Sequence, residues 1–391
     1  MRSTLRLSAA AWLVALGLAL DTRAATITVV NMDGAGEGFN DPTPVAPVGG
    51  NPGTTLGAQR LNAFQAAANV WGGLLVSGVT IFVDATMDPL TCSSTRAVLG
   101  HAGPTTVHRD FTGALVAGTW YPQALANKLH GSDLAAAIDD ISAAFNSAIG
   151  TTCSFPNVWY YGLDASPPGT DIDFFSVVLH EIGHGLGFLT FVDSSGVKLM
   201  GFDDTFELNL EDHSLALLWP PMTDGQRAAS SIDTGDLHWV GAAVVANSGF
   251  LTAGRDPISG HVQMFAPNPF QPGSSVSHWD TALFPDQLME PIYTGPNHNP
   301  SIARDLMTDI GWGAAPCGDV SGDRVVNIGD ALLVAQFDVG IRPCGVAPFS
   351  HPEVCDVNGD GACNIGDALR MAQCDVGLIS CAFTCRPFTC P

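Results

Sequence analysis

The chain has 391 residues, of which 46% are hydrophobic and 14% are charged, and its formal net charge is −23. This length and apolar content suit one large or two unequal globular domains, and they exclude a disordered chain, a collagen, a coiled coil and a multi-span membrane protein. The negative charge disfavours nucleic acid and anionic lipid as partners and favours cations, with Ca²⁺ as the first candidate.

The N-terminus has the pattern of a secretory signal peptide over residues 1–24. Two arginines precede an apolar stretch at residues 7–20, and small residues follow at Ala24 and Ala25. A short N-terminal core helix is the alternative. No later stretch reaches the ~18–20 uninterrupted apolar residues of a membrane-spanning helix. We therefore expect a secreted, extracellular protein without a transmembrane segment.

The elements predicted from hydrophobic spacing alternate between strand and helix in the first half of the chain, which favours an α+β or α/β domain. The helix predicted at 131–149 depends on Leu134, Ile138, Ile141 and Phe145, which recur at helical spacing. In chain order we expect a strand at 25–31, a loop at 32–57, a helix at 58–76, strands at 79–85 and 158–163 on either side of the helix at 131–149, a helix at 174–185 and an irregular region at 190–277.

The ten cysteines are an even set, which is typical of an oxidising compartment. Cys92 and Cys153 are the only two in the first 316 residues, so we expect them to form a disulfide. The other eight allow too many pairings for any to be assigned. They are Cys317, Cys344, Cys355, Cys363, Cys374, Cys381, Cys385 and Cys390.

The segment HEIGHGLGF at residues 180–188 carries the strongest catalytic signal. His180 and His184 are four residues apart, so on a helix both imidazoles lie on one face and can hold one Zn²⁺. Glu181 lies beside them, where its carboxylate can polarise a zinc-bound water. The glycines that follow predict the end of the helix. The alternative is an ordinary helix with two hydrogen-bonded histidines.

The motif H-E-x-x-H-x-x-G resembles the metzincin clan of zinc peptidases. The position of the clan's next histidine holds Thr190 here, so the third ligand must come from elsewhere. The segments SSVSHWD, PDQLMEP and SIARDLMTDIGW follow in an order that resembles the leishmanolysin family. This resemblance implies that His278 is the third zinc ligand. It also implies that Met289 is the Met-turn methionine, an apolar floor under the metal.

The resemblance implies an α+β catalytic domain over residues 25–313, with a mixed twisted sheet and an active-site helix. It implies a zinc-dependent endopeptidase with one catalytic Zn²⁺ and a protein or peptide substrate. Glu181 would assist the attack of zinc-bound water and pass the proton to the leaving amine. Two alternatives stay open: a non-catalytic secreted or adhesion protein with a structural zinc site, and a zinc hydrolase for a non-peptide amide or ester.

Several other polar residues could also act as ligands. A tyrosine that touches the metal in some metzincins is replaced by Pro291, and we expect Tyr293 to be structural. Competing ligands in the insertion before the third histidine are Asp193, Asp203, Asp204, Glu207 and His213. The histidines without ligand spacing, which we expect to be surface or core residues, are His101, His108, His130, His238, His261 and His298.

Residues 319–344 and 356–381 are two copies of one sequence that share 16 of 26 positions. Each copy begins with oxygen-bearing side chains at positions 1, 3, 5, 9 and 12 of a Ca²⁺ loop, and a helix follows. These hard oxygen ligands suit Ca²⁺ rather than zinc. The predicted calcium ligands are Asp319, Ser321, Asp323, Asn327, Asp330, Asp356, Asn358, Asp360, Asn364 and Asp367.

A duplicated half EF-hand with Asp at position 12 resembles a type I dockerin. The resemblance implies a small α-helical domain over residues 317–382 with two Ca²⁺ ions, after a linker at 314–316 and before a Cys-containing tail at 383–391. It also implies a cohesin-like or cell-surface partner. Where dockerins that bind cohesins often carry hydroxyl residues, this chain has Ile328-Gly329 and Ile365-Gly366.

Overall fold

The computed structural model describes the N-terminal region without interruption and most of the C-terminal region. The predicted signal peptide lies outside the described residues apart from Ala24, as do the predicted linker at 314–316 and the predicted calcium ligand Asp323. Within the described part of the chain, no helix combines the length and hydropathy that a membrane span requires. The described residues are 24–313, 317–321, 325–344, 348–349, 351–386, 388 and 390.

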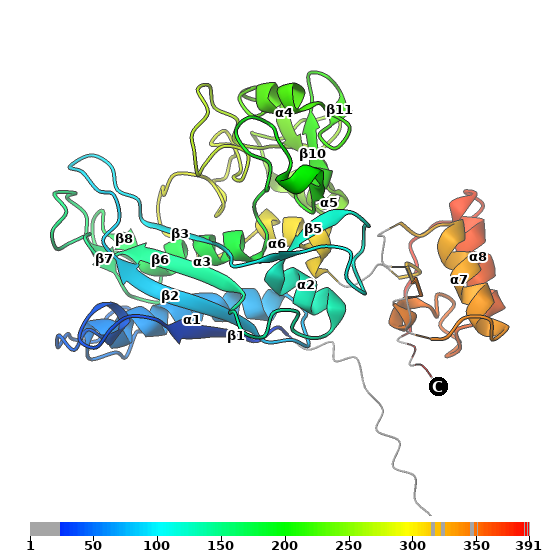
Figure 1. Ribbon diagram of the computed structural model, residues 1–391, viewed down its shortest axis with the longest axis horizontal. Helices are drawn as coiled ribbons and strands as arrows, with labels where there is room; N and C mark the ends of the chain where they lie inside the picture. Colours follow the sequence, from blue (N-terminus) through cyan, green and yellow to red (C-terminus); the bar gives the residue numbers. More distant parts are fainter. Residues whose placement is uncertain are drawn as a thin grey trace, which may run out of the picture.

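The N-terminal region is built around a four-stranded mixed sheet with the strand order β1-β2-β6-β3 (Figure 1). Strands β1 (Ile27–Asn31), β2 (Ile81–Asp88) and β6 (Ile141–Asn146) are parallel, and β3 (Gly100–Pro104) pairs antiparallel with β6 at the edge of the sheet. Alternate residues of β2 are buried, while those between them are partly exposed. Strand β2 therefore has one face in the core, and the predicted α+β class with a mixed sheet is confirmed.

Two helices, α1 (Leu56–Leu74) and α3 (Phe174–Leu186), pack against each other and against this sheet. The indole N–H of Trp71 in α1 donates to the carbonyl oxygen of Leu179 in α3 at 2.8 Å. Because both groups are buried, this hydrogen bond ties the two helices together at a fixed position. Both helices were predicted from the sequence at nearly these bounds.

Helix α3 has clear signals at both ends. The Asp173 side chain accepts hydrogen bonds from the backbone N–H and the hydroxyl of Ser176, which caps the first turn. The helix ends just before Gly187, whose φ of 123° favours glycine, as the sequence predicts. A side chain at Gly185 would clash with Ile141 of β6, so this glycine lets the helix lie close to the sheet.

The other elements of the N-terminal region are short. The strands are β4 (Val107–His108), β5 (Thr119–Pro122), β7 (Trp159–Tyr160), β8 (Ile172–Asp173), β9 (Asp203–Asp204), β10 (Leu210–Asp212), β11 (Leu217–Leu218), β12 (Leu237–Trp239) and β13 (Val262–Gln263). The α-helices are α2 (Gln123–His130), α4 (Asp224–Ser230), α5 (Ala242–Asn247) and α6 (Ile302–Met307). Single turns are η1 (Gly38–Asn40), η2 (Leu199–Gly201), η3 (Glu207–Asn209), η4 (Ser248–Phe250) and η5 (Thr308–Trp312).

Residues 190–277, predicted to be irregular, contain a second sheet with the order β11-β10-β12-β13. Its pairs are antiparallel, and its strands have only two or three residues each. Strands this short cannot show a period of two in the sequence, which is why the prediction missed them. With α4 and α5, this sheet forms a lobe at the top of Figure 1, hereafter the upper lobe.

The helix predicted at 131–149 is wrong. Strand β6 occupies Ile141–Asn146 and lies between β2 and β3, and only Ser142 of its residues is exposed. A strand buried on both faces loses the alternation that marks a half-buried strand. Ile138 is exposed, so the helical spacing that suggested an apolar stripe is a coincidence.

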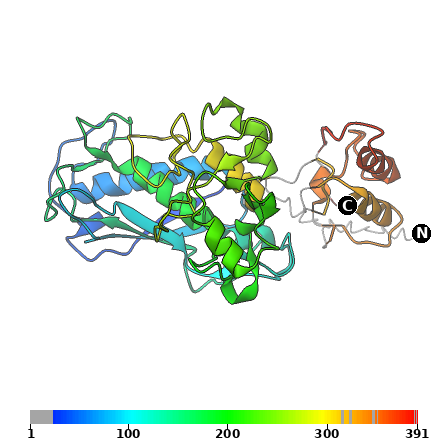
Figure 2. The same ribbon diagram turned by 90° about the horizontal axis from the view of Figure 1, so that it is seen from above.

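The C-terminal region has its own core around Val320, Val334, Phe349 and Met371. Helices α7 (Ile328–Asp338) and α8 (Ile365–Asp375) pack together, and η6 (Pro352–Val354) lies between them in sequence. Both views show this region, coloured orange to red, as a compact unit (Figures 1 and 2). The predicted Cys92–Cys153 disulfide is present, and the other pairs are Cys317–Cys385, Cys344–Cys390, Cys355–Cys363 and Cys374–Cys381.

Candidate metal centre and calcium loops

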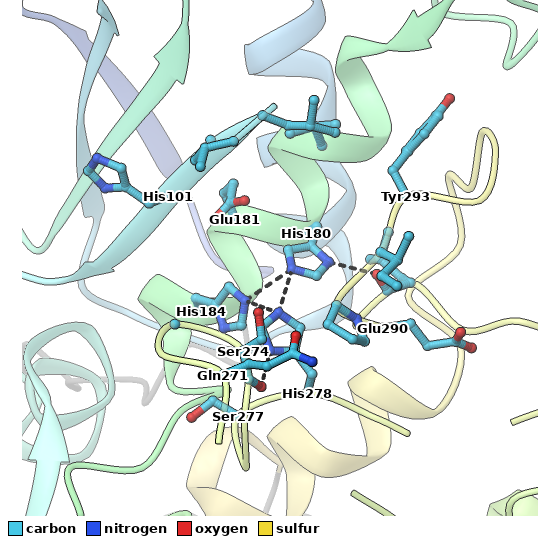
Figure 3. Close-up of a pocket in the computed structure, with 18 of the residues that line it drawn as sticks. His101, His180, Glu181, His184, Gln271, Ser274, Ser277, His278, Glu290 and Tyr293 are labelled. Atoms are coloured by element: carbon cyan, nitrogen blue, oxygen red, sulfur yellow. Dashed lines mark hydrogen bonds between the residues drawn. The ribbon is translucent and has the colours of Figure 1, made fainter. Parts of the chain in front are cut away.

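Three histidines from distant segments converge at the predicted zinc site. His180 and His184 project from α3, and His278 comes from the loop that follows the upper lobe (Figure 3). The Nε2 atoms of His180 and His184 lie 3.0 Å apart, and each lies 3.2 Å from Nε2 of His278. Around a tetrahedral zinc with Zn–N of ~2.0–2.1 Å, neighbouring nitrogens are separated by about 3.3 Å. The spacing therefore fits a single ion.

The orientation of each imidazole is set by a backbone carbonyl. Nδ1 of His180, His184 and His278 lies 2.7–2.8 Å from the carbonyl oxygens of Leu288, Phe188 and Ser274, respectively. A carbonyl oxygen only accepts, so each Nδ1 donates a hydrogen and each Nε2 keeps its lone pair. Three lone pairs facing one point repel each other unless a cation lies between them. The donor set therefore fits zinc.

Burial keeps the three histidines neutral. It lowers the pKa of His180 to about 4 and, with His180 nearby, the pKa of His184 to about 3. Burial also lowers the pKa of His278 well below its usual value. Neutral imidazole is the form that binds metal, so the cluster is ready to do so at neutral pH.

Glu181 lies next to the cluster at the cleft and is 8% exposed (Figure 3). Burial raises the pKa of Glu181 to about 8, and a hydrogen bond with the backbone of Ala102 in β3 opposes this effect. A divalent cation held by the neighbouring histidines would lower that pKa again, since opposite charge favours the ionised carboxylate. With a cation in the cluster, Glu181 would be an ionised carboxylate beside it.

Met289 is fully buried beneath α3. A Cβ at Gly183 would lie 2.8 Å from its Sδ, so the glycine makes room for the methionine. The carbonyl oxygen of Met289 accepts the backbone N–H of Trp279, and the preceding Leu288 carbonyl orients His180. The turn around Met289 therefore supports two of the three histidine segments through its backbone. From the sequence, only its side chain was expected to contribute, as an apolar floor under the metal.

The cluster opens into a cleft with a volume of about 1520 Å³. The cleft is lined by the three histidines, Glu181, residues 95–102 around β3, and residues 285–288 and 290–297 after the histidine loop. This volume is large enough for an extended segment of several residues.

The competing carboxylates contact groups other than the three histidines, although Asp193 lines the same cleft. Asp204 accepts hydrogen bonds from the Thr190 hydroxyl and the Phe191 N–H, and Glu207 lies 3.3 Å from Nζ of Lys198. Asp193 accepts N–H groups of its own turn, and Asp203 contacts Lys198. Tyr293 accepts the Asp173 N–H through its hydroxyl, which is the structural role expected for it.

The remaining histidines divide into two groups. His298 lies 2.8 Å from Asp173 and stacks on Phe175, and His130 contacts the Thr112 carbonyl, so both have the structural roles expected. His101 is exposed, and His108 contacts the Thr106 hydroxyl. His238 and His261, also expected to be surface or core residues, lie together with His213 in a second cluster. Spacing gave no signal, because the three come from separate segments.

The second calcium loop brings three of its predicted ligands together. Carboxylate oxygens of Asp356, Asp360 and Asp367 lie within 4.8 Å of one another, and Asp356 and Asp367 are fully buried. Burial raises the pKa of Asp367, so an ionised cluster here needs a compensating cation. Oxygen ligands in this arrangement suit Ca²⁺.

The described residues of the first loop share two features with the second loop. In each repeat the Asp at position 12 accepts two backbone N–H groups of its loop, and the Asn at position 9 caps the following helix. Asp319 and Asp330 are fully buried, like their counterparts in the second repeat. The predicted ligands that the structure places in the two loops are Asp319, Ser321, Asn327, Asp330, Asp356, Asn358, Asp360, Asn364 and Asp367.

Two family models match parts of the chain. A family described as SPBPB7E8-like matches residues 74–204, which include the first two histidines and Glu181. The dockerin type I domain matches residues 317–374. No curated protein and no solved structure matches the chain. The C-terminal region is therefore a dockerin type I domain, as its duplicated loops predict, and the match supports Ca²⁺ as its ion.

Replacing Asp367 with asparagine is expected to weaken one calcium site by roughly tenfold or more, because the position-12 side chain loses its charge. Calcium bound per chain, measured at a series of free Ca²⁺ concentrations, tests this. Asp375→Asn is the matched control, since Asp375 is an exposed residue at the end of the same helix. Unchanged calcium binding by Asp367→Asn would contradict the assignment of this loop.

Proposed function

We propose that residues 25–313 form a secreted zinc-dependent endopeptidase of the metzincin type, and that the dockerin domain attaches it to a protein partner. The observation that carries the proposal is the convergence of three imidazole Nε2 atoms beside a buried glutamate in an open cleft. Three neutral histidines leave a fourth position on a tetrahedral zinc, which distinguishes catalytic from closed structural sites. Five disulfides support export.

Strand β3 favours a peptide substrate. It ends the strand order of its sheet, so among the described residues its outer edge has no strand neighbour. Gly100, His101 and Ala102 of this strand line the cleft. An extended peptide can pair with such an edge through its main chain, which places a scissile bond near Glu181. A small amide or ester would gain nothing from this edge.

The chain's own groups account for the proton transfers. When bound, zinc polarises a substrate carbonyl and lowers the pKa of a coordinated water. The Glu181 carboxylate accepts a proton from the attacking water and then donates it to the departing amide nitrogen. The three carbonyl oxygens behind the histidines hold the rings still, so the cluster does not rearrange during the reaction.

The dockerin domain presents equivalent apolar side chains at the start of its two helices. Ile328 and Leu332 on α7 and Ile365 and Leu369 on α8 are exposed. A solvent-exposed apolar pair repeated in this way supports a protein partner, cohesin-like or on a cell surface. The isoleucines stand where hydroxyl residues are common in cohesin-binding dockerins, so the partner surface would be apolar rather than polar.

The test is cleavage of a mixed-sequence peptide library by the full chain. Cleavage that stops with a zinc chelator and returns with added zinc is the expected result. A chain that holds zinc at His180, His184 and His278 but cleaves no peptide would favour the non-catalytic alternative. Cleavage of model esters or amides without any peptide cleavage would favour the non-peptide hydrolase.

A further inference from the structure

A second group of metal-binding side chains lies in the upper lobe. Ring nitrogens of His213, His238 and His261 lie within 4.8 Å of one another. Glu211 adds a carboxylate, whose Oε2 lies 2.6 Å from Nδ1 of His261 and 3.8 Å from Nδ1 of His213. Imidazole and carboxylate are ligands of first-row transition metals, so four suitable donors share one place.

The small sheet of the upper lobe builds this group. Glu211 in β10 and His238 in β12 are direct cross-strand partners, so their side chains lie on one face of the sheet. His213 follows β10, and its ring stacks on that of His238 with the centroids 4.5 Å apart. His261 precedes β13, which pairs with β12. Backbone pairing therefore holds the four residues together.

The donor atoms of the group are buried without hydrogen bonds. Four buried atoms have no hydrogen-bond partner among the described residues: Nδ1 of His213, His238 and His261, and Oε2 of Glu211. The 2.6 Å contact between Glu211 and His261 is close, but it is not aligned as a hydrogen bond. Buried polar atoms are nearly always satisfied, so four such atoms in one place point to a shared ligand.

A backbone carbonyl orients one of the rings, and a carboxylate lies near a second. Nε2 of His238 lies 3.0 Å from the Gly235 carbonyl oxygen, so this nitrogen donates and Nδ1 keeps its lone pair. Nε2 of His213 faces Oδ2 of Asp256 at 3.9 Å. Hydrogen bonds from Ser259 lower the pKa of Asp256 to about 2, so that carboxylate is ionised. A carbonyl or carboxylate behind each imidazole is the usual support of a metal-binding histidine.

We infer that His213, His238, His261 and Glu211 bind a second divalent transition-metal ion of the zinc class. Three nitrogens and one carboxylate fill a tetrahedral shell, which makes the site closed and structural rather than catalytic. Nitrogen ligands exclude Ca²⁺ and Mg²⁺ as the preferred ions. The rings would move inward slightly on binding, because nitrogens around one zinc are about 3.3 Å apart.

The second site would stabilise the segment that carries His278. The Gln263 carbonyl, two residues after His261, accepts the Asp280 N–H at 3.0 Å, and the Phe265 N–H donates to the His278 carbonyl at 2.9 Å. A metal ion that fixes His261 therefore fixes the strand on which the third histidine rests. The inference holds for the upper lobe whether or not the first centre is catalytic.

The test is the number of zinc ions bound per full-length chain after zinc loading and removal of free metal, with calcium counted separately. We expect two zinc ions in the unmodified chain and one in His261→Gln. We expect one in His180→Ala/His184→Ala and none in the chain that combines all three changes. His101→Gln, which alters an exposed histidine outside both clusters, is expected to keep two.

Two zinc ions in His261→Gln, or none in a folded His180→Ala/His184→Ala chain, would overturn the inference. If His261→Gln does not fold, Glu211→Gln replaces it, since this change removes the charged ligand at constant size. Cobalt bound to the His180→Ala/His184→Ala chain is expected to give the visible absorption of a tetrahedral site. One zinc that is lost in His261→Gln but kept in His180→Ala/His184→Ala would support this site and contradict the proposed peptidase centre.

Discussion

Replacing Glu181 with glutamine is expected to lower kcat/KM for peptide cleavage by about 10²–10⁴-fold while the zinc content stays the same. The amide has nearly the size of the carboxylate but cannot accept the proton of the attacking water. Because Glu181 is buried beside the histidines without being one of the converging ligands, its loss leaves the three Nε2 atoms in place. Initial rates with a peptide chosen from the library and zinc counts on the same samples test the prediction.

Glu290 is the matched comparison for Glu181. It is also a buried carboxylate at the cleft, and burial raises its pKa to about 7. Its Oε1, however, accepts the Gln287 N–H at 2.6 Å within its own turn. We expect Glu290→Gln to retain activity within several fold. A large loss of activity in Glu290→Gln together with full activity in Glu181→Gln would contradict the assignment of Glu181 as the base and would favour Glu290.

Another outcome would keep Glu181 essential for activity but give it a different role. If Glu181→Gln lost zinc and activity together, the carboxylate would support the metal site instead of moving a proton. Measuring both quantities on each variant separates these roles, since a proton carrier affects the rate and a supporting residue affects the zinc content first.

The part of the site that lies within one helix could be predicted from the sequence. A helix places residues four apart on one face. The apolar run around His180 and His184 and the glycines that follow were therefore enough to predict that these two side chains lie together. His278 could not be derived in that way, because its place depends on how the upper lobe folds back onto α3. Only the order of three short motifs suggested it. No sequence feature marks the carbonyl oxygens that orient the three rings, since every residue has a backbone carbonyl.

Tertiary contacts also explain the errors in the fold prediction. Strand β6 is buried on both faces, so its sequence reads equally well as a buried helix until its pairing with β2 is known. The cluster in the upper lobe has no sequence signal, because its residues lie in or next to three strands that are too short to recognise. In both cases, long-range pairing decided the structure where local spacing was ambiguous.

Replacing His278 with alanine is expected to weaken zinc binding at the first centre by about 10²-fold or more. Structural zinc sites bind with ~10–16 kcal/mol shared among four ligands, so one ligand contributes about 3 kcal/mol. Peptide cleavage should fall with the zinc content. Competition with a chelator of known affinity measures the zinc affinity of the first centre. All chains compared carry the His261→Gln substitution, so that the second cluster does not contribute.

Ser274→Ala is the control for this experiment. The Ser274 carbonyl oxygen orients His278, and the substitution changes the side chain while leaving that carbonyl in place. Zinc affinity should therefore stay within a few fold of the unmodified chain. Unchanged affinity in His278→Ala would mean that the third ligand is another residue, and the candidates would then be the carboxylates of the upper lobe. Asp193, Asp203, Asp204 and Glu207, the carboxylates predicted as competing ligands, contact groups other than the three histidines, so His278 is the ligand that the geometry favours.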